Sequence, residues 1–190
     1  MKTFSKRLRQ FAGLSLAFIA AVCAFADSAE AQPRDYMTDE EIEIVRDAQD
    51  IDLRIDALVK MMDRRFTLLG LETGGWRERP KDVEKWGPAP AGSRLELITD
   101  IRKLLVKAVD DLDVIAQRSG DSLKQNQTEG KLFPKAVRKL DDAAKRYVVP
   151  LKHGIDSVTN EAERGQYLNA MELCEDIIEA AKKLPAADAK

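Results

Sequence analysis

The sequence predicts an all-α protein, an antiparallel four-helix bundle with a long Trp/Pro/Gly-containing loop between its first and second helices. Three observations lead to this prediction. Apolar residues recur at steps of three and four along four segments, which is the spacing of one helical face. No segment alternates apolar and polar residues like a strand rich in Val, Ile and Thr. Helices with one apolar face each must bury those faces together, and a four-helix bundle does so with few elements.

Composition and charge narrow the class of protein further. Of the 190 residues, 34% are charged and 6% are aromatic, a composition typical of amphipathic helices. The 31 basic and 33 acidic residues leave a formal net charge of −2. This balance provides neither the basic stripe of a nucleic-acid-binding protein nor a cationic patch for anionic lipid.

The N-terminal segment 1–31 has the order of a secretory signal peptide. Four basic residues precede an uncharged apolar run from Phe11 to Ala26, and small residues follow the run. This order predicts a periplasmic or secreted protein, cleaved after Ala31 or, alternatively, after Ala26. The run is shorter than the ~20 residues of a membrane-spanning helix, so we expect no stable membrane span after cleavage.

The remaining chain is expected to form one domain. Segment 32–37 is interpreted as a flexible N-terminus, 38–185 as the four-helix bundle domain, and 186–190 as a loose C-terminal tail. Cys174 is the only cysteine outside the signal, so the domain has no internal disulfide. We expect Cys174 to be a buried core thiol, since free cysteines are among the most buried residues; a disulfide between two chains is the alternative.

The first helix is predicted to run without interruption from Ile42 to Leu69. Thr38 and Glu41 have the spacing of a capping box, in which each side chain accepts a hydrogen bond from a backbone N–H of the first turn. At ~1.5 Å per residue the helix would be about 45 Å long, ending near Gly70. Acid-before-base pairs at i,i+4 are expected on its surface: Asp50 with Arg54, and Asp56 with Lys60.

Residues 71–92 cannot extend this helix. They contain Gly74-Gly75, Pro80 and the run Trp86-Gly87-Pro88-Ala89-Pro90-Ala91-Gly92, with room for a short helical turn from Lys81 to Trp86. Links in bundles usually have about 2–8 residues, and longer loops in compact domains are often functional.

Two further helices follow this loop. Ser93 and Glu96 form a second capping box, and the apolar stripe behind them ends before Gly120. Residues 120–131 are polar and are expected to form a loop. Pro134 suits the first turn of the third helix, where no N–H is needed. A kink or a break is expected near Pro150, because proline removes one helical hydrogen bond and clashes with the preceding turn.

The fourth helix is expected to begin after Thr159 or Asn160. Its apolar face contains Tyr167, Met171 and Cys174, and Pro185 is expected to end it.

The two tryptophans of the chain both lie in the 71–92 loop, beside arginines and prolines. Trp and Arg dominate the hot spots of binding interfaces. The loop therefore either recognises a partner protein, or it folds back so that its tryptophans cap the open end of the bundle core. The residues of this candidate interaction surface are Trp76, Arg77, Arg79, Trp86, Pro88 and Pro90.

The sequence offers little for a cofactor or for catalysis. There is no Cys-x-x-Cys-His for covalent haem, and a di-iron site needs two Glu-x-x-His motifs where the chain has one histidine, His153. A b-type haem held by His153 and by Met61 or Met62 is the remaining arrangement, although the polar neighbours of His153 indicate a surface residue. No Gly-x-Ser-x-Gly or glycine-rich phosphate loop is present, so we expect no enzyme, no cofactor and no metal site.

Two acidic pairs, Asp110-Asp111 and Asp141-Asp142, are the remaining metal candidates. Adjacent residues on a helix point ~100° apart, so the carboxylates of a pair do not converge. Lys145 and Arg146 offer the second pair simpler partners at i,i+4.

The signal, the Trp86-Gly87-Pro88 turn before Ser93 and the order of the helices resemble small uncharacterised exported helical proteins of bacteria, a resemblance that implies no particular activity. The sequence therefore predicts an exported helical-bundle protein with a non-catalytic protein-interaction or structural role, whose partner is another exported protein. The alternative is a carrier that binds a small molecule or haem within the bundle core.

Overall fold

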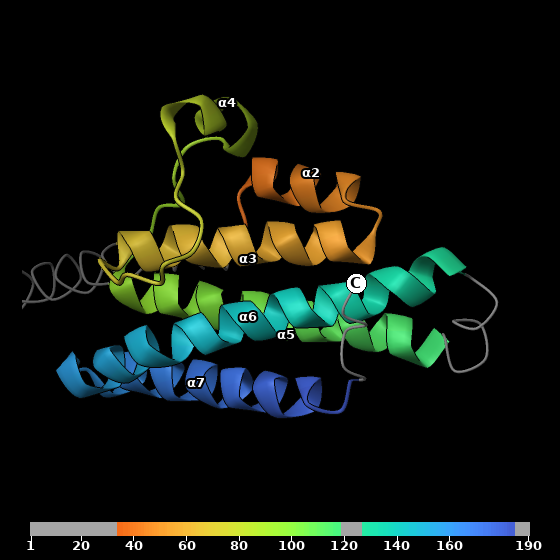
Figure 1. Ribbon diagram of the computed structural model, residues 1–190. Coiled ribbons are helices and arrows are strands. Elements are labelled where there is room, and N and C mark those ends of the chain that lie inside the picture. The colour runs from red at the N-terminus through yellow and green to blue at the C-terminus, as the bar shows by residue number, and fades with distance from the viewer. Residues whose placement is uncertain (1–33, 119–126, 185–190) are drawn as a thin grey trace, which may run out of the picture. The chain divides into compact units, whose positions relative to one another are not determined.

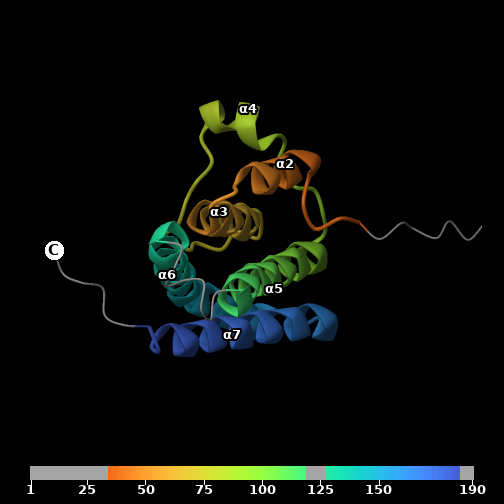
Figure 2. The same cartoon turned by 90° about the vertical axis from the view of Figure 1, so that its right-hand side faces the viewer.

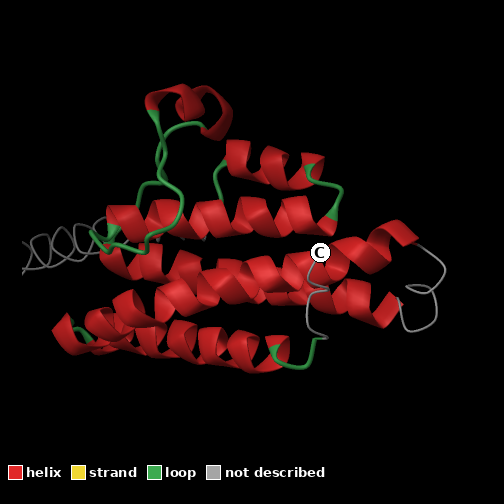
Figure 3. Ribbon diagram, in the orientation of Figure 1, coloured by secondary structure: helices red, strands yellow, loops and turns green. Residues whose placement is uncertain are grey.

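All of the regular structure in residues 34–118 and 127–184, which are the residues that the computed structural model describes, is helical (Figure 3). Four helices are long and three are short. None of the described helices is long and apolar enough to cross a membrane. In chain order the elements are α2 (Asp39–Asp47), α3 (Ile51–Leu68), η2 (Pro80–Asp82), α4 (Val83–Trp86), α5 (Arg94–Arg118), α6 (Gln127–Ser157) and α7 (Glu161–Ala181) (Figure 1).

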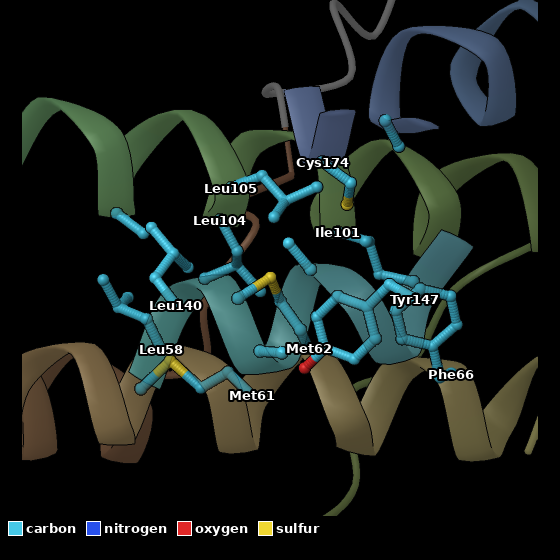
Figure 4. Close-up of a cluster of buried hydrophobic side chains, with 14 of the residues drawn as sticks. Leu58, Met61, Met62, Phe66, Ile101, Leu104, Leu105, Leu140, Tyr147 and Cys174 are labelled. Atoms are coloured by element: carbon cyan, nitrogen blue, oxygen red, sulfur yellow. The ribbon is translucent and has the colours of Figure 1, made fainter. Parts of the chain in front are cut away.

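The core lies between the four long helices. Helix α3 packs against α5 and α6, and α7 packs against the same two helices on the side away from α3 (Figures 1 and 2). Burial of each large apolar side chain stabilises the fold by about 1.5–3 kcal/mol, so this core supplies most of the driving force for folding. The labelled core side chains in Figure 4 come from all four helices: Leu58, Met61, Met62, Phe66, Ile101, Leu104, Leu105, Leu140, Tyr147 and Cys174.

The first predicted helix is two helices, so the expectation of one uninterrupted helix of about 45 Å is wrong. Helix α2 ends at Asp47 and α3 begins at Ile51. Between them Ala48 has ψ 81° and Asp50 has ψ 133°, both outside the helical range. The chain reverses here, and α2 lies against the side of α3 that faces away from α7 (Figures 1 and 2).

The two expected surface ion pairs have different outcomes. Lys60 and Asp56 form theirs, at 2.7 Å. Arg54 instead donates from its Nε to the carbonyl oxygen of Ala48 at 3.0 Å, which satisfies a carbonyl at the end of α2. Asp50 stands at the N-cap position of α3.

Both predicted capping boxes are confirmed. The Glu41 side chain accepts from the Thr38 N–H at 3.2 Å, and Thr38 Oγ1 accepts from the Glu41 N–H at 3.3 Å. Ser93 and Glu96 make the same pair of contacts at 2.6 and 3.3 Å. Asn160 caps α7 as expected, since its side chain accepts from two N–H groups of the first turn.

Helix α6 corrects the expected start of the third helix and excludes a break at Pro150. It begins at Gln127, within the segment 120–131 that was expected to be a loop, so Pro134 lies inside the helix instead of in its first turn. It also continues through Pro150 without a break. Pro150 is buried, and packing against α7 supports the helix where the proline removes a hydrogen bond.

The domain extends further toward the N-terminus than expected. Tyr36 and Met37, assigned above to a flexible segment 32–37, are partly buried and pack against the core. The predicted signal 1–31 and its cleavage sites, residues 119–126 and the tail 186–190 lie outside the described residues.

Candidate functional site

The 71–92 loop is held on helix α3 by three consecutive buried charged residues, Asp63, Arg64 and Arg65, which we call the charged triplet. Their exposed fractions are 1%, 4% and 0%. Successive residues of a helix point about 100° apart, so each side chain of the triplet reaches a different segment of the chain. Burial of charge is costly unless each group is paired, and each of the three is.

Asp63 binds the first part of the loop. Its Oδ1 accepts hydrogen bonds from Thr73 Oγ1 and from Tyr147 Oη of α6, both at 3.0 Å. Its Oδ2 accepts from the backbone N–H of Trp76 at 2.9 Å. Burial, and then the nearby Asp63 carboxylate, raise the pKa of Tyr147 well above its ordinary value, so Tyr147 acts as a hydrogen-bond donor at neutral pH.

Arg64 binds the last part of the loop. Its guanidinium donates to the carbonyl oxygens of Trp86, Gly87 and Pro88 at 3.1, 3.2 and 3.0 Å. Its Nε donates to Glu78 Oε2 at 3.1 Å. The guanidinium carbon also lies 5.8 Å from the centre of the Trp86 ring, within the range of a cation–π contact. One side chain thus satisfies three successive carbonyls at the end of α4.

Arg65 joins α3 to the N-terminal part of the domain. It forms two hydrogen bonds with the buried carboxylate of Glu41, at 3.0 and 2.7 Å, and donates to the carbonyl oxygen of Tyr36 at 2.7 Å. An ion pair at 3.4 Å connects it to Asp100 of α5. Arg64 shares Glu41 at 2.9 Å, so the two arginines are balanced by the carboxylates of Glu41 and Asp100.

The structure divides the six residues of the candidate interaction surface. Trp86 and Pro90 are buried and Trp76 is half-buried, whereas the side chains of Arg77, Arg79 and Pro88 are exposed. The centres of the two tryptophan rings lie 5.1 Å apart, and both rings pack against the core. Both tryptophans fold back onto the protein, and Arg77, Arg79 and Pro88 are the exposed members of the candidate interaction surface.

The exposed part of the loop borders a shallow depression of about 460 Å³, which we call the loop groove. Leu68 of α3 and Val83 of α4 line it with 45% and 48% of their surface exposed. Arg77 forms an ion pair with Glu72, and Arg79 with Asp82 at 2.9 Å. Hydrogen bonding to Arg79 lowers the pKa of Asp82. The residues that line the loop groove are Arg64, Thr67, Leu68, Arg77, Glu78, Arg79, Pro80, Val83 and Ala89.

The proposed haem ligands do not come together. His153 is exposed on α6, whereas Met61 and Met62 are fully buried in the core, so haem ligation by this His–Met pair is wrong. Cys174 is buried, and burial raises the pKa of its thiol to about 12.

One aspartate of each acidic pair forms an ion pair with a lysine of the same helix. Asp111 pairs with Lys107 at 3.1 Å and Asp141 with Lys145 at 2.6 Å. The expected partner of Asp142, Arg146, lies 3.8 Å from Asp63. Within residues 34–118 and 127–184, no three His, Cys, Asp or Glu side chains are placed to hold a metal ion.

Sequence reasoning did not identify the charged triplet or Glu41 as site residues. One signal was available: Asp63, Arg64 and Arg65 are three successive charges between Met62 and Phe66 of the apolar stripe. Three successive residues cover most of the circumference of a helix turn, so a helix covered on several sides buries at least one of them.

Comparisons of this chain with protein-family models, with curated proteins and with solved structures find no match. Its function is therefore inferred from the site itself.

Proposed function

We propose that this chain is an exported, non-catalytic protein-interaction module, which binds a segment of another exported protein in the loop groove. The proposal includes an antiparallel four-helix bundle formed by α3, α5, α6 and α7. Two observations support this arrangement: each long helix packs against two neighbouring long helices, and only residues 158–160 separate α6 from α7. Such a short connection favours antiparallel neighbours.

The observation that carries the proposal is a loop that is fixed from beneath and borders a groove with two exposed large apolar side chains, Leu68 of α3 and Val83 of α4. Asp63 and Arg64 bind the loop at both ends, and the tryptophans fill the space below it. Leu68 and Val83 both remain exposed in the lining of this one groove, and exposed apolar side chains that gather in one place mark an interaction site. A preorganised surface of this kind loses little conformational entropy on binding.

The polar groups of the loop groove favour a protein segment with acidic residues. Among the described residues, Arg77 and Arg79 are paired with their neighbours on the surface, and such exposed pairs contribute little to stability. A carboxylate of a bound segment can therefore replace these partners at little cost in free energy.

Site-specific photo-crosslinking tests the proposal. A photoreactive amino acid is placed at Val83, and at Val149 of α6 as the control, in the cells that make the protein. Val149 is 74% exposed against 48% for Val83, so non-specific collisions favour the control. We expect one defined adduct from position 83 that position 149 does not give.

A charge reversal makes the test specific to the loop groove. Arg77→Glu with Arg79→Glu should abolish the adduct at position 83 without changing the circular dichroism spectrum, because both side chains are exposed. The same adducts from both positions, or an adduct that survives the charge reversal, would contradict the proposal.

A further inference from the structure

A second apolar depression, of about 440 Å³, lies between the C-terminal half of α5, the N-terminal half of α6 and the C-terminal half of α7. We call it the α5–α6–α7 groove. Its floor consists of Leu112, Leu140 and Ile177, one buried side chain from each helix. It shares no residue with the loop groove, and an inference about it does not depend on the function proposed above.

The size and walls of this groove suit a small molecule. Phe133 and Val137 of α6 and Leu173 of α7 are half-buried around the floor. Pockets that hold small ligands have volumes of about 300–1,000 Å³ and are mainly apolar, and bundles build such sites from facing helices. Three surrounding helices enclose a compact molecule better than they fit a broad protein surface.

The charges at the rim indicate the polar end of the ligand. Asp113 of α5 and Asp176 of α7 line the groove and are exposed, and neither forms an ion pair with another described residue. Among the described residues that line the groove, Lys183 is the only basic one. Two carboxylates from two different helices against one ammonium group leave the rim with a net negative charge, which attracts a cationic group.

We propose that the α5–α6–α7 groove binds a small cationic amphiphile. Its apolar body lies over Leu112, Leu140 and Ile177, and its protonated amine lies at the rim between Asp113 and Asp176.

Binding is tested on the protein purified after export. Nile red, which fluoresces in apolar surroundings, serves as the probe, and decylamine and decanoic acid compete for it. We expect Nile red fluorescence to rise on binding, and decylamine to displace the dye at a concentration about tenfold lower than decanoic acid. Equal displacement by both, or stronger displacement by the acid, would overturn the assignment of a cationic ligand.

A matched pair of substitutions on α7 locates the site. Ala180 is exposed at the rim, so Ala180→Trp fills the groove without removing a core side chain. Ala162 is exposed at the start of the same helix and outside the groove, so Ala162→Trp is the control. We expect the first variant to weaken dye and amine binding by about tenfold or more, and the control to bind as the wild type does. Equal binding by both variants would overturn the proposal.

The rim charges and the alternative occupant have separate tests. Asp113→Asn with Asp176→Asn should weaken decylamine binding by about three- to tenfold and leave decanoic acid binding no weaker. An unchanged affinity for decylamine would contradict the role of the two carboxylates.

Sedimentation equilibrium tests whether a second copy of the chain occupies the groove instead. A dimer that Ala180→Trp dissociates would mean that the partner chain occupies the groove, and would overturn the small-molecule proposal.

Discussion

The carboxylate of Glu41 and the guanidinium of Arg65 form an ion pair with two hydrogen bonds, and neither side chain has any solvent-exposed surface. Glu41 also closes the capping box of α2 by accepting from the Thr38 N–H. The pair therefore couples the start of α2 to the last turn of α3. Desolvation of two charges opposes folding, and the paired geometry with its additional hydrogen bonds offsets that cost.

Loss of the Glu41 charge should destabilise the domain strongly. Glu41→Gln leaves Arg64 and Arg65 without their shared carboxylate, and breaking a buried ion pair in this way costs about 3–5 kcal/mol. Glu43→Gln is the matched control on the same helix, because Glu43 and its partner Arg46 are exposed; it should cost less than about 1 kcal/mol. Urea unfolding followed by circular dichroism measures both, and equal costs would show that the buried pair has no special role.

Removal of the Asp63 carboxylate should release the 71–92 loop. Asp63→Ala removes the acceptor of the Trp76 N–H and leaves the buried Tyr147 hydroxyl with only the carbonyl oxygen of Val59, which should cost about 1–3 kcal/mol. Acrylamide should then quench tryptophan fluorescence more strongly than in the wild type. Asp56→Ala, at a half-exposed position of the same helix, should leave the quenching unchanged. Unchanged quenching in Asp63→Ala would mean that packing alone holds the loop.

Two helical glycines should respond in opposite directions to alanine. A Cβ at Gly154 of α6 would overlap the ring of Tyr167 of α7, whereas a Cβ at Gly165 would meet nothing within 4 Å. Gly165→Ala should therefore stabilise the protein by about 0.5–1 kcal/mol through helix propensity. Gly154→Ala should instead destabilise it by about 1–3 kcal/mol through overpacking. Thermal unfolding compares them, and stabilisation by Gly154→Ala would refute close contact between the helices.

The Cys174 thiol should be inert in the folded protein. Burial raises its pKa to about 12, and the thiolate is the reactive form. Iodoacetamide at pH 8 should leave the thiol of the exported protein unmodified until urea unfolds the chain, as mass spectrometry can measure. Rapid modification without urea, or a dimer that only reducing agent separates, would favour the alternative of a disulfide between chains.

The ion pair of Asp52 with Lys135 should contribute stability that depends on pH. The two groups lie 2.6 Å apart, and the hydrogen bond from Lys135 lowers the pKa of Asp52 below its ordinary value of 3.8. The folded state thus favours the carboxylate: its contribution is present above the ordinary pKa and is lost as pH falls through the lowered one.

Asp52→Asn tests this linkage. Because Lys135 is largely exposed, we expect the variant to be less stable than the wild type by no more than about 1 kcal/mol at pH 7. The difference should shrink at an acid pH below the lowered pKa of Asp52, where the carboxylate of the wild type is protonated. Urea unfolding at the two pH values provides the measurement, and a difference that is the same at both would contradict the shifted pKa.

The features that could be predicted from the sequence are those that depend on neighbouring residues. The boxes Thr38/Glu41 and Ser93/Glu96 join residues three positions apart, and Asn160 caps the helix that follows it. Apolar periodicity likewise identified the all-helical class, because each helix must bury one face whichever neighbour covers it.

Tertiary structure alone decided the features that depend on residues distant in the chain. The break between α2 and α3 carries no Gly or Pro, and α2 turns back onto α3, where Glu41 meets Arg65, 24 positions along the chain. The tryptophans are covered because Asp63 and Arg64 hold their loop against α3. The free energy of a buried charge depends on the partner that packing brings to it. Local periodicity carries no information about that partner. The helices could therefore be predicted from the sequence, whereas the packing of distant residues decided which surface the loop presents.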